Sequence, residues 1–162
     1  MLEKAILIAD NNIQKEVDIV TDNCTDQHLN SKFPLKILVA EDNETNLKIV
    51  MSLLSKMGYK VQSVINGQEA VEKIKMMDFD IVFMDIQMPV MDGLEATVKI
   101  KNELPKEKQP LIIALTANSG IEDKQGCFNA GMVDHITKPV NLDILQQTLM
   151  KWGNYISTHK MQ

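Results

Sequence analysis

The stretch of sequence that decides the fold is DIVFMDIQMPVMDG, residues 80–93. Its first half, up to Asp85, is a short run of apolar residues with an acid at each end. A continuous apolar run of this length is typical of a strand that is buried on both faces of a parallel sheet. The second half is a loop that ends in Asp92-Gly93, and a helical pattern continues from there to about Glu103. These residues therefore predict a buried strand, a loop and a helix in succession.

The same succession of strand and helix is repeated on both sides of this stretch. Asn43 is a predicted N-cap, Asn66-Gly67 opens the next helix, and Gly131 stands where a left-handed C-cap would sit. Because residues 60–65 alternate more than the other apolar runs, we expect that strand nearer an edge of the sheet. The predicted strands cover residues 36–40, 60–65, 80–85, 111–115 and 133–137, and the helices start near residues 43, 66, 93, 121 and 141.

Five strand–helix units predict an α/β fold, in which helices cover both faces of a parallel sheet. The chain has 162 residues, which suits one domain or one domain with a tail. Residues 1–34 are rich in Asp, Asn, Gln and Thr and show no sustained period, so we interpret them as an arm or linker. The domain itself is expected over residues 35–153, followed by a C-terminal tail over residues 154–162.

Composition and charge argue against several classes of protein. The net charge is −5, all 17 basic residues are lysine, and only 4% of the residues are aromatic, so direct binding of nucleic acid is not expected. Cys24 and Cys127 are too few for a disulfide framework, and we find neither a signal peptide nor a stretch of membrane-spanning length. We therefore expect a cytoplasmic location and no membrane contact from this chain.

Charged and polar residues follow the predicted strands at one edge of the sheet. Glu41-Asp42, Asp85, Thr116 and Lys138 each stand at the carboxyl end of a strand, where ligands of such sheets bind. Carboxylates held close together repel one another, and a hard divalent cation such as Mg²⁺ removes that repulsion. With the metal bound, the Asp85 carboxylate could attack a phosphorus atom in line. Lys138 and the Thr116 hydroxyl could then stabilise the phosphoryl oxygens.

Four motifs at these positions resemble the receiver domain of the response regulators of two-component signalling. The resemblance covers about three quarters of the chain, and the wording of residues 84–97 is most similar to receivers attached to hybrid sensor histidine kinases. It implies a flavodoxin-like (βα)5 three-layer sandwich whose five parallel strands lie in the order 2-1-3-4-5. The motifs are Glu41-Asp42-Asn43, residues 84–93 (MDIQMPVMDG), Ala114-Leu115-Thr116-Ala117 and Thr137-Lys138-Pro139.

The resemblance also implies a role for each site residue. Asp85 would accept a phosphoryl group from a phosphohistidine, and Thr116 would move toward the phosphate while residue 135 acts as the switch. The Lys138-Pro139 peptide stands where the family usually has a cis bond. The ligands implied for Mg²⁺ are Asp42, Asp85 and the Gln87 carbonyl, with Glu41 acting through water; Gln87 and Asn118 would tune the rate of hydrolysis.

Two residues depart from the family's usual pattern. Glu41 stands where the first acid is commonly Asp, and His135 stands where the switch residue is usually Tyr or Phe. For His135, an edge-strand histidine without a role fits as well as a titratable switch. Taken singly, Glu41 and Asp42 could cap a helix and Lys138 could be a solvated lysine; together they favour a functional site. Outside the acidic cluster, Met88 and Met91 are expected to be half exposed, and Cys127 packed.

The predicted function is a phosphoacceptor switch that signals through protein contacts. Its partner would be a histidine kinase or a histidine phosphotransfer protein, and homodimerisation is left open. Only ten residues follow Trp152, so we expect no separate output domain and no turnover beyond phosphoryl transfer and self-dephosphorylation. The resemblance favours the receiver of a hybrid histidine kinase, which would be tethered to the membrane if its parent is a sensor kinase. The alternatives are a stand-alone single-domain regulator and an unphosphorylated receiver-fold scaffold. A flavodoxin-like flavin binder is disfavoured, because a flavin phosphate would need a loop rich in Ser, Thr and Gly where this chain has acids.

Overall fold

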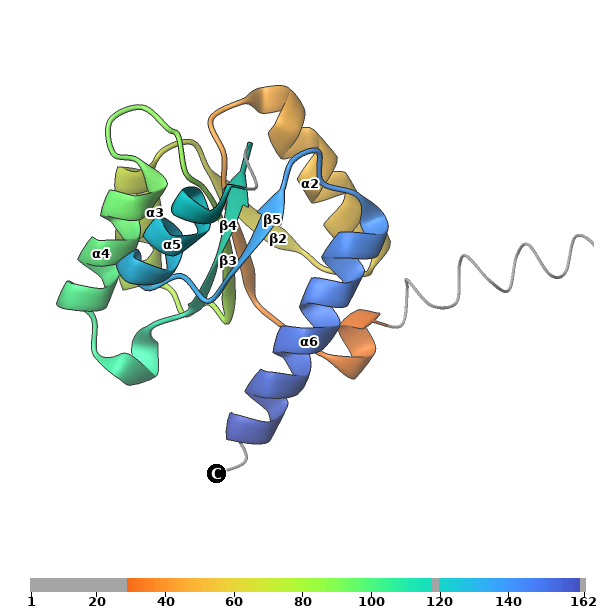
Figure 1. Cartoon of the computed structure of the whole chain (residues 1–162). Coiled ribbons are helices and arrows are strands. Elements are labelled where there is room, and N and C mark those ends of the chain that lie inside the picture. Colours follow the sequence, from red (N-terminus) through yellow and green to blue (C-terminus); the bar gives the residue numbers. More distant parts are fainter. Residues whose placement is uncertain (1–28, 118–119, 161–162) are drawn as a thin grey trace, which may run out of the picture.

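The computed structural model describes residues 29–117 and 120–160 and shows a five-stranded parallel sheet between two layers of helices (Figure 1). The strands lie in the order β2-β1-β3-β4-β5, which confirms the expected fold and topology. The elements are β1 (Ile37–Ala40), α2 (Glu44–Lys56), β2 (Val61–Val64), α3 (Gly67–Met76), β3 (Ile81–Asp85), α4 (Gly93–Glu103), the 3₁₀ turn η1 (Lys106–Lys108), β4 (Leu111–Thr116), α5 (Ile121–Ala130), β5 (Asp134–Thr137) and α6 (Leu142–Lys160).

Side chains alternate between the two faces of the central strands, and each face is covered. The residues of β1, β3 and β4 are buried almost throughout, as continuous apolar runs predict. Ile37 and Val39 of β1 share a core with α2 and α6, whereas Leu38 and Ala40 share one with α3, α4 and α5. The edge strand β2 has a mixed pattern, with Gln62 exposed and Val64 buried, which agrees with its predicted position.

The ends of the helices are set by short polar residues and by one glycine. The side chains of Asn43, Asn66 and Asp92 each accept a hydrogen bond from the backbone N–H three residues further on, which satisfies a free donor of the first helical turn. At the other end of α5, Gly131 has a φ of 114° and ends the helix in the left-handed conformation that the sequence predicted.

The packed structure extends beyond both expected domain boundaries. The arm was expected to end at residue 34, yet Leu29 and Phe33 are each only 4% exposed and belong to the α2–α6 core. The domain was expected to end at residue 153, yet α6 runs through Lys160, and Ile156 packs against the same core. Residues 1–34 are mostly polar and show no sustained period, so Leu29 and Phe33 were assigned to the arm and not to the core. Within the described ranges, no helix has both the length and the apolar content needed to cross a bilayer.

Candidate functional site

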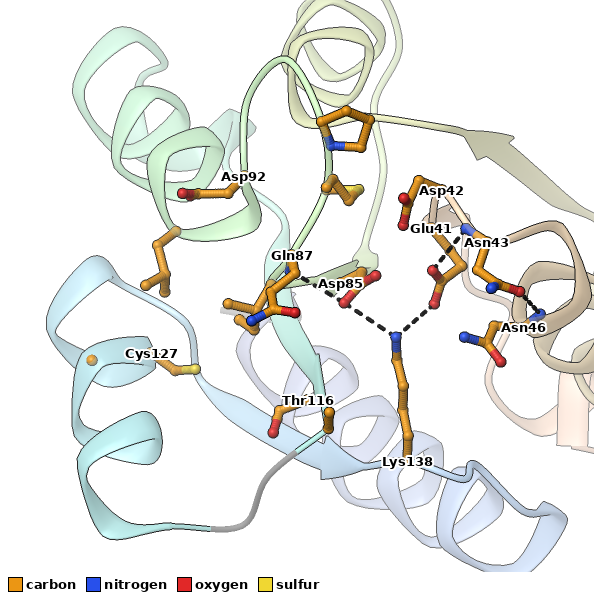
Figure 2. A pocket seen from close by; sticks show the side chains of 16 residues that line it. Glu41, Asp42, Asn43, Asn46, Asp85, Gln87, Asp92, Thr116, Cys127 and Lys138 are labelled. Carbon is orange, nitrogen blue, oxygen red and sulfur yellow. Dashed lines mark hydrogen bonds and ion pairs between the residues drawn. The ribbon is translucent and has the colours of Figure 1, made fainter.

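The carboxyl ends of four strands deliver the predicted site residues to one cleft of about 840 Å³ (Figure 2). Glu41 and Asp42 follow β1, Asp85 is the last residue of β3, and Thr116 is the last residue of β4. Lys138 follows β5, and its backbone N–H donates to the carbonyl of Thr116 at 2.7 Å. Because all five strands are parallel, these ends meet at the same edge, so the topology alone brings the five residues together.

Lys138 reaches into the cleft and bridges two carboxylates. Its ammonium nitrogen lies 2.9 Å from Glu41 Oε2 and 3.2 Å from Asp85 Oδ1 (Figure 2). The side chains of Glu41 and Asp85 are 1% and 8% exposed, and that of Lys138 is 21% exposed. Because these charges are largely removed from water, each depends on its partners to offset the loss of hydration.

Glu41 is held more tightly than its expected role implies. Its Oε1 atom accepts the backbone N–H of Asn43 at 3.0 Å, and its Oε2 atom faces Lys138. The resemblance implied contact with a metal through water, whereas in the structure this carboxylate pairs directly with the lysine. The sequence could not separate the two roles, because both need only an acid at the end of β1.

Burial and charge shift the three pKa values in different directions. Burial and the neighbouring Glu41 carboxylate raise the pKa of Asp85 to about 6, despite the opposing effect of Lys138. Burial also acts to raise the pKa of Glu41, but the hydrogen bonds from Lys138 and from the Asn43 N–H outweigh it and bring the pKa below its ordinary value. For Lys138, burial acts to lower the pKa, and the two carboxylates raise it above the ordinary value. Of the two buried carboxylates, Asp85 is therefore the one whose charge the folded state tolerates less.

The acidic cluster has the donor set of a divalent-cation site. Glu41, Asp42 and Asp85 each offer a carboxylate oxygen, and these three atoms lie within 4.8 Å of one another. Asp42 is exposed at the rim, whereas the other two acids are buried, so a cation here would keep part of its water shell. Gln87 also lines the cleft, and its backbone N–H donates to Asp85 Oδ1 at 3.3 Å.

The loop from Ile86 to Asp92 holds Asp85 in place through close backbone contacts. A Cβ atom at Gly93 would lie 2.2 Å from the Asp85 carbonyl oxygen, and one at Gly67 would lie 2.4 Å from the Met91 carbonyl oxygen. Glycine at both positions lets the loop fold back against the end of β3. The sequence contained these glycines, but nothing in their spacing showed that they support the site. Met88 and Met91 were expected to be half exposed; both are only 9% exposed, because the folded loop packs them into the core.

The remaining predicted residues lie at different distances from the cleft. Thr116 lines it and is only 5% exposed, and the Lys138-Pro139 peptide is cis. His135 is paired with Ala114 in the register of β5 and β4 and is not among the residues that line the cleft. Its Nδ1 atom is buried, has no hydrogen-bond partner within the described ranges, and lies 4.0 Å from Asp134 Oδ1. Asn118 lies outside the described residues.

Comparisons with known proteins agree with this geometry. Residues 37–150 match the family described as the response regulator receiver domain. The chain belongs to this family. A hybrid signal transduction histidine kinase (H) of Dictyostelium discoideum is 44% identical over 124 residues, which are 74% of this chain and 9% of that protein. Histidine protein kinase 1 of Candida albicans is 39% identical over 139 residues, 80% of this chain and 6% of that protein. This receiver domain thus spans a small part of the curated relatives it matches.

Two solved receiver domains have the same fold. One is from a sensor histidine kinase of Pseudomonas aeruginosa and is described with magnesium coordinated in its active-site cleft. It is 36% identical, has a TM-score of 0.68, and matches 74% of this chain and 98% of that one. The other is the receiver domain of the Saccharomyces cerevisiae response regulator Ssk1, in complex with the histidine phosphotransfer protein Ypd1. It is 34% identical, with a TM-score of 0.68 over 74% of this chain and 88% of that one.

Proposed function

We propose that this receiver domain accepts a phosphoryl group on Asp85 from a phosphohistidine of a partner protein. The observation that carries the proposal is the position of Lys138, whose ammonium nitrogen lies 3.2 Å from the Asp85 carboxylate in the cleft. A lysine held in a buried acidic cluster places its ammonium group next to Asp85, within hydrogen-bond reach of the oxygens of a phosphoryl group bound there. A scaffold without phosphorylation would have no use for that arrangement.

The chain's own residues would carry out the transfer by positioning and charge. A carboxylate oxygen of Asp85 attacks the phosphorus in line, the phosphorus–nitrogen bond breaks, and its electron pair leaves with the imidazole of the donor. The Lys138 ammonium stabilises the negative charge on the phosphoryl oxygens, and the Thr116 hydroxyl donates a hydrogen bond to one of them. Hydrolysis of the acyl phosphate, or its transfer to another histidine, would restore the Asp85 carboxylate.

The residues present fit Mg²⁺, because three carboxylate oxygens converge within 4.8 Å and one of the acids is open to water. Asp42, Asp85 and the Gln87 carbonyl would hold the ion, with Glu41 acting through water or remaining on Lys138. When bound, Mg²⁺ neutralises phosphoryl charge that the single lysine leaves uncompensated.

The identity of the partner and of the parent protein is also a proposal. Relatives with matching segments include hybrid histidine kinases, and one solved relative is bound to a histidine phosphotransfer protein. We infer that this domain comes from a hybrid histidine kinase and exchanges its phosphoryl group with such a phosphotransfer protein in the cytoplasm. Phosphorylation would alter the surface formed by α5 and β5, with Thr116 and His135 as the switching residues, and Gln87 and Asn118 would tune hydrolysis.

The test is the intact mass of the full chain after incubation with acetyl phosphate, with and without Mg²⁺. We expect an adduct of one phosphoryl group that requires Mg²⁺, is released by hydroxylamine and is absent from Asp85→Asn. Asp92→Asn is the matched control, since Asp92 lines the same cleft but caps α4, a task that asparagine also performs. This control should retain the adduct.

Two results would overturn the proposal. An adduct that persists in Asp85→Asn would place the phosphoryl group elsewhere. If the wild-type chain instead forms no adduct, beryllofluoride with Mg²⁺ supplies a second assay, because this phosphoryl analogue needs the same carboxylate and lysine but no donor chemistry. Failure of both assays would leave the scaffold interpretation in place.

A further inference from the structure

Residues 29–33 pack against the domain at the end of the sheet opposite the cleft. Leu29 and Phe33 are each 4% exposed, and both lie in the core that α2 and α6 share. The backbone N–H of Asn30 donates to the Met57 carbonyl at 3.2 Å, just past the last residue of α2. This short segment is therefore held by both apolar contacts and a backbone hydrogen bond.

Gly153 of α6 forms a notch for the ring of Phe33. A Cβ atom at this position would lie 2.7 Å from Cγ of that ring and 2.9 Å from Cδ1. Glycine in a helix interior is unfavourable relative to alanine, because it has more conformational freedom to lose and adds no side-chain packing. The close fit to Phe33 gives Gly153 a structural reason, and it shows that α6 is shaped to receive this segment.

Tyr59 fixes the segment from its other side. Its hydroxyl donates toward two carbonyl oxygens, that of Phe33 at 2.8 Å and that of Leu29 at 3.3 Å. Tyr59 is itself only 4% exposed, precedes β2 by two residues and belongs to the core that α2 and α6 share. The Leu29 carbonyl also accepts the backbone N–H of Phe33 at 2.8 Å, so the Tyr59 hydroxyl serves mainly as the partner of the Phe33 carbonyl at the end of this helical turn.

We propose that residues 29–33 are a junction clamp, which fixes the chain that enters the domain to the end of the sheet opposite the phosphoacceptor cleft. The clamp contacts the C-terminal end of α2, the residues before β2 and the second half of α6, whereas the cleft lies at the carboxyl ends of the strands (Figure 1). Any part of the protein N-terminal to Leu29 is thus attached on the far side. A separate phosphohistidine protein can approach the cleft from the open side. This inference does not depend on phosphorylation of Asp85.

The chain contains its own probes for a test of the clamp. Trp152 is the single tryptophan and precedes the Gly153 notch by one residue, and Cys24 precedes Leu29 by five. Five residues span at most ~18 Å, so an acceptor dye on Cys24 stays near the notch while the clamp is closed. We would label Cys24 in a Cys127→Ser background and measure energy transfer from Trp152. Once the clamp opens, thirteen residues separate the dye from β1, and transfer should fall at least twofold.

Two variants weaken the contact between Phe33 and Gly153, one on each side of it, and a substitution at an exposed phenylalanine is the control. Phe33→Ala removes the ring, and Gly153→Ala fills the notch; both should lower energy transfer and speed hydrogen exchange at the Asn30 amide at least tenfold. Gly153→Ala is the sharper variant, because helix propensity alone predicts a higher melting temperature and the clamp predicts a lower one. Phe128→Ala, at a phenylalanine that is 48% exposed on α5, should change neither readout.

Three results would overturn the clamp. The first is unchanged transfer and unchanged Asn30 exchange in both variants. The second is a higher melting temperature for Gly153→Ala. The third is energy transfer that rises with protein concentration, which would mean that the segment of one copy occupies the notch of another. Should Phe33→Ala fail to fold, Tyr59→Phe removes only the hydroxyl and should still speed exchange in residues 29–33.

Discussion

The two ends of the sheet are built on opposite principles. At the carboxyl ends, Glu41, Asp85 and Lys138 place three charges in a largely buried cluster, and one carboxylate has its pKa raised to about 6. At the amino ends, the junction clamp fills a notch with the ring of Phe33 and a backbone turn, and adds no charge to the core. The first end is costly to fold and suited to chemistry, whereas the second supplies stability and determines where the chain enters.

The groups suited to phosphoryl chemistry and the apolar contacts of the junction clamp therefore lie at opposite ends of the strands. Groups poised to bind a phosphoryl group and a cation repel one another while neither is present, so the apo cleft lowers the stability of the fold. The apolar end then supplies stability at a distance from the cleft. If the comparison is right, substitutions in the cleft should change phosphorylation, whereas substitutions in the junction clamp should change stability alone.

The largest expected effect is that of Lys138→Met, which would damage both properties. The variant leaves Glu41 and Asp85 buried beside each other without their lysine, which should lower the free energy of unfolding by roughly 3 kcal/mol. It should also slow formation of the acyl phosphate by about 100-fold or more, because a positioned donor to the phosphoryl oxygens is lost. Denaturant unfolding in EDTA and adduct mass against time measure the two effects. Wild-type stability in EDTA would show that the carboxylates do not need the lysine.

Phe33→Ala should lower the stability of the chain and leave phosphorylation of Asp85 unchanged. Truncating a buried phenylalanine removes apolar contacts and leaves a cavity, and the expected loss is roughly 3 kcal/mol in the free energy of unfolding. At a temperature well below the transition, the rate of adduct formation on Asp85 should equal that of the wild-type chain. Phe128→Ala, the exposed counterpart, should lose less than ~0.5 kcal/mol. A variant that is destabilised and also slow to accept the phosphoryl group would show that the two ends are coupled.

Asp85→Asn should abolish phosphorylation and yet stabilise the chain. Burial raises the pKa of Asp85 to about 6, above its value of 3.8 when unfolded, so the stability that its protonated form contributes is present below pH 4 and is lost as the pH rises to 6. Asparagine resembles the protonated form at every pH. In EDTA at pH 7 the variant should therefore be more stable by on the order of 2 kcal/mol, and the difference should vanish toward pH 4. Equal stabilities at pH 7 would show that the folded state tolerates the Asp85 charge.

The same contrast explains how far the sequence alone could predict this molecule. The five strands and the convergence of Glu41, Asp85 and Lys138 follow from local patterns, because parallel strands place their ends at one edge, whereas the strand order came from the family resemblance. The junction clamp has no local pattern: Leu29 and Phe33 are two apolar side chains in a polar segment, and the notch that receives Phe33 comes from Gly153, more than a hundred residues further along the chain. Such contacts are defined only by tertiary packing. The direct ion pair between Glu41 and Lys138 was not predicted for a different reason: an acid at the end of β1 fits a lysine partner and a water-mediated metal contact equally well.

The smallest expected effect is that of Tyr59→Phe, which tests the polar part of the clamp. Near pH 7 the loss of the hydrogen bonds to Phe33 and Leu29 should lower the free energy of unfolding by about 1 kcal/mol. Burial raises the pKa of Tyr59 to about 12, from 10 in the unfolded chain, so its contribution is intact below pH 10 and declines as the pH rises to 12. Phenylalanine does not ionise, so when unfolding is followed by denaturant titration at each pH, the stability advantage of the wild-type chain should shrink across that interval and reverse by pH 12. Parallel curves from pH 9 to 12 would show that the Tyr59 hydroxyl is open to water, and the clamp would then rest on the fit between Phe33 and Gly153 alone.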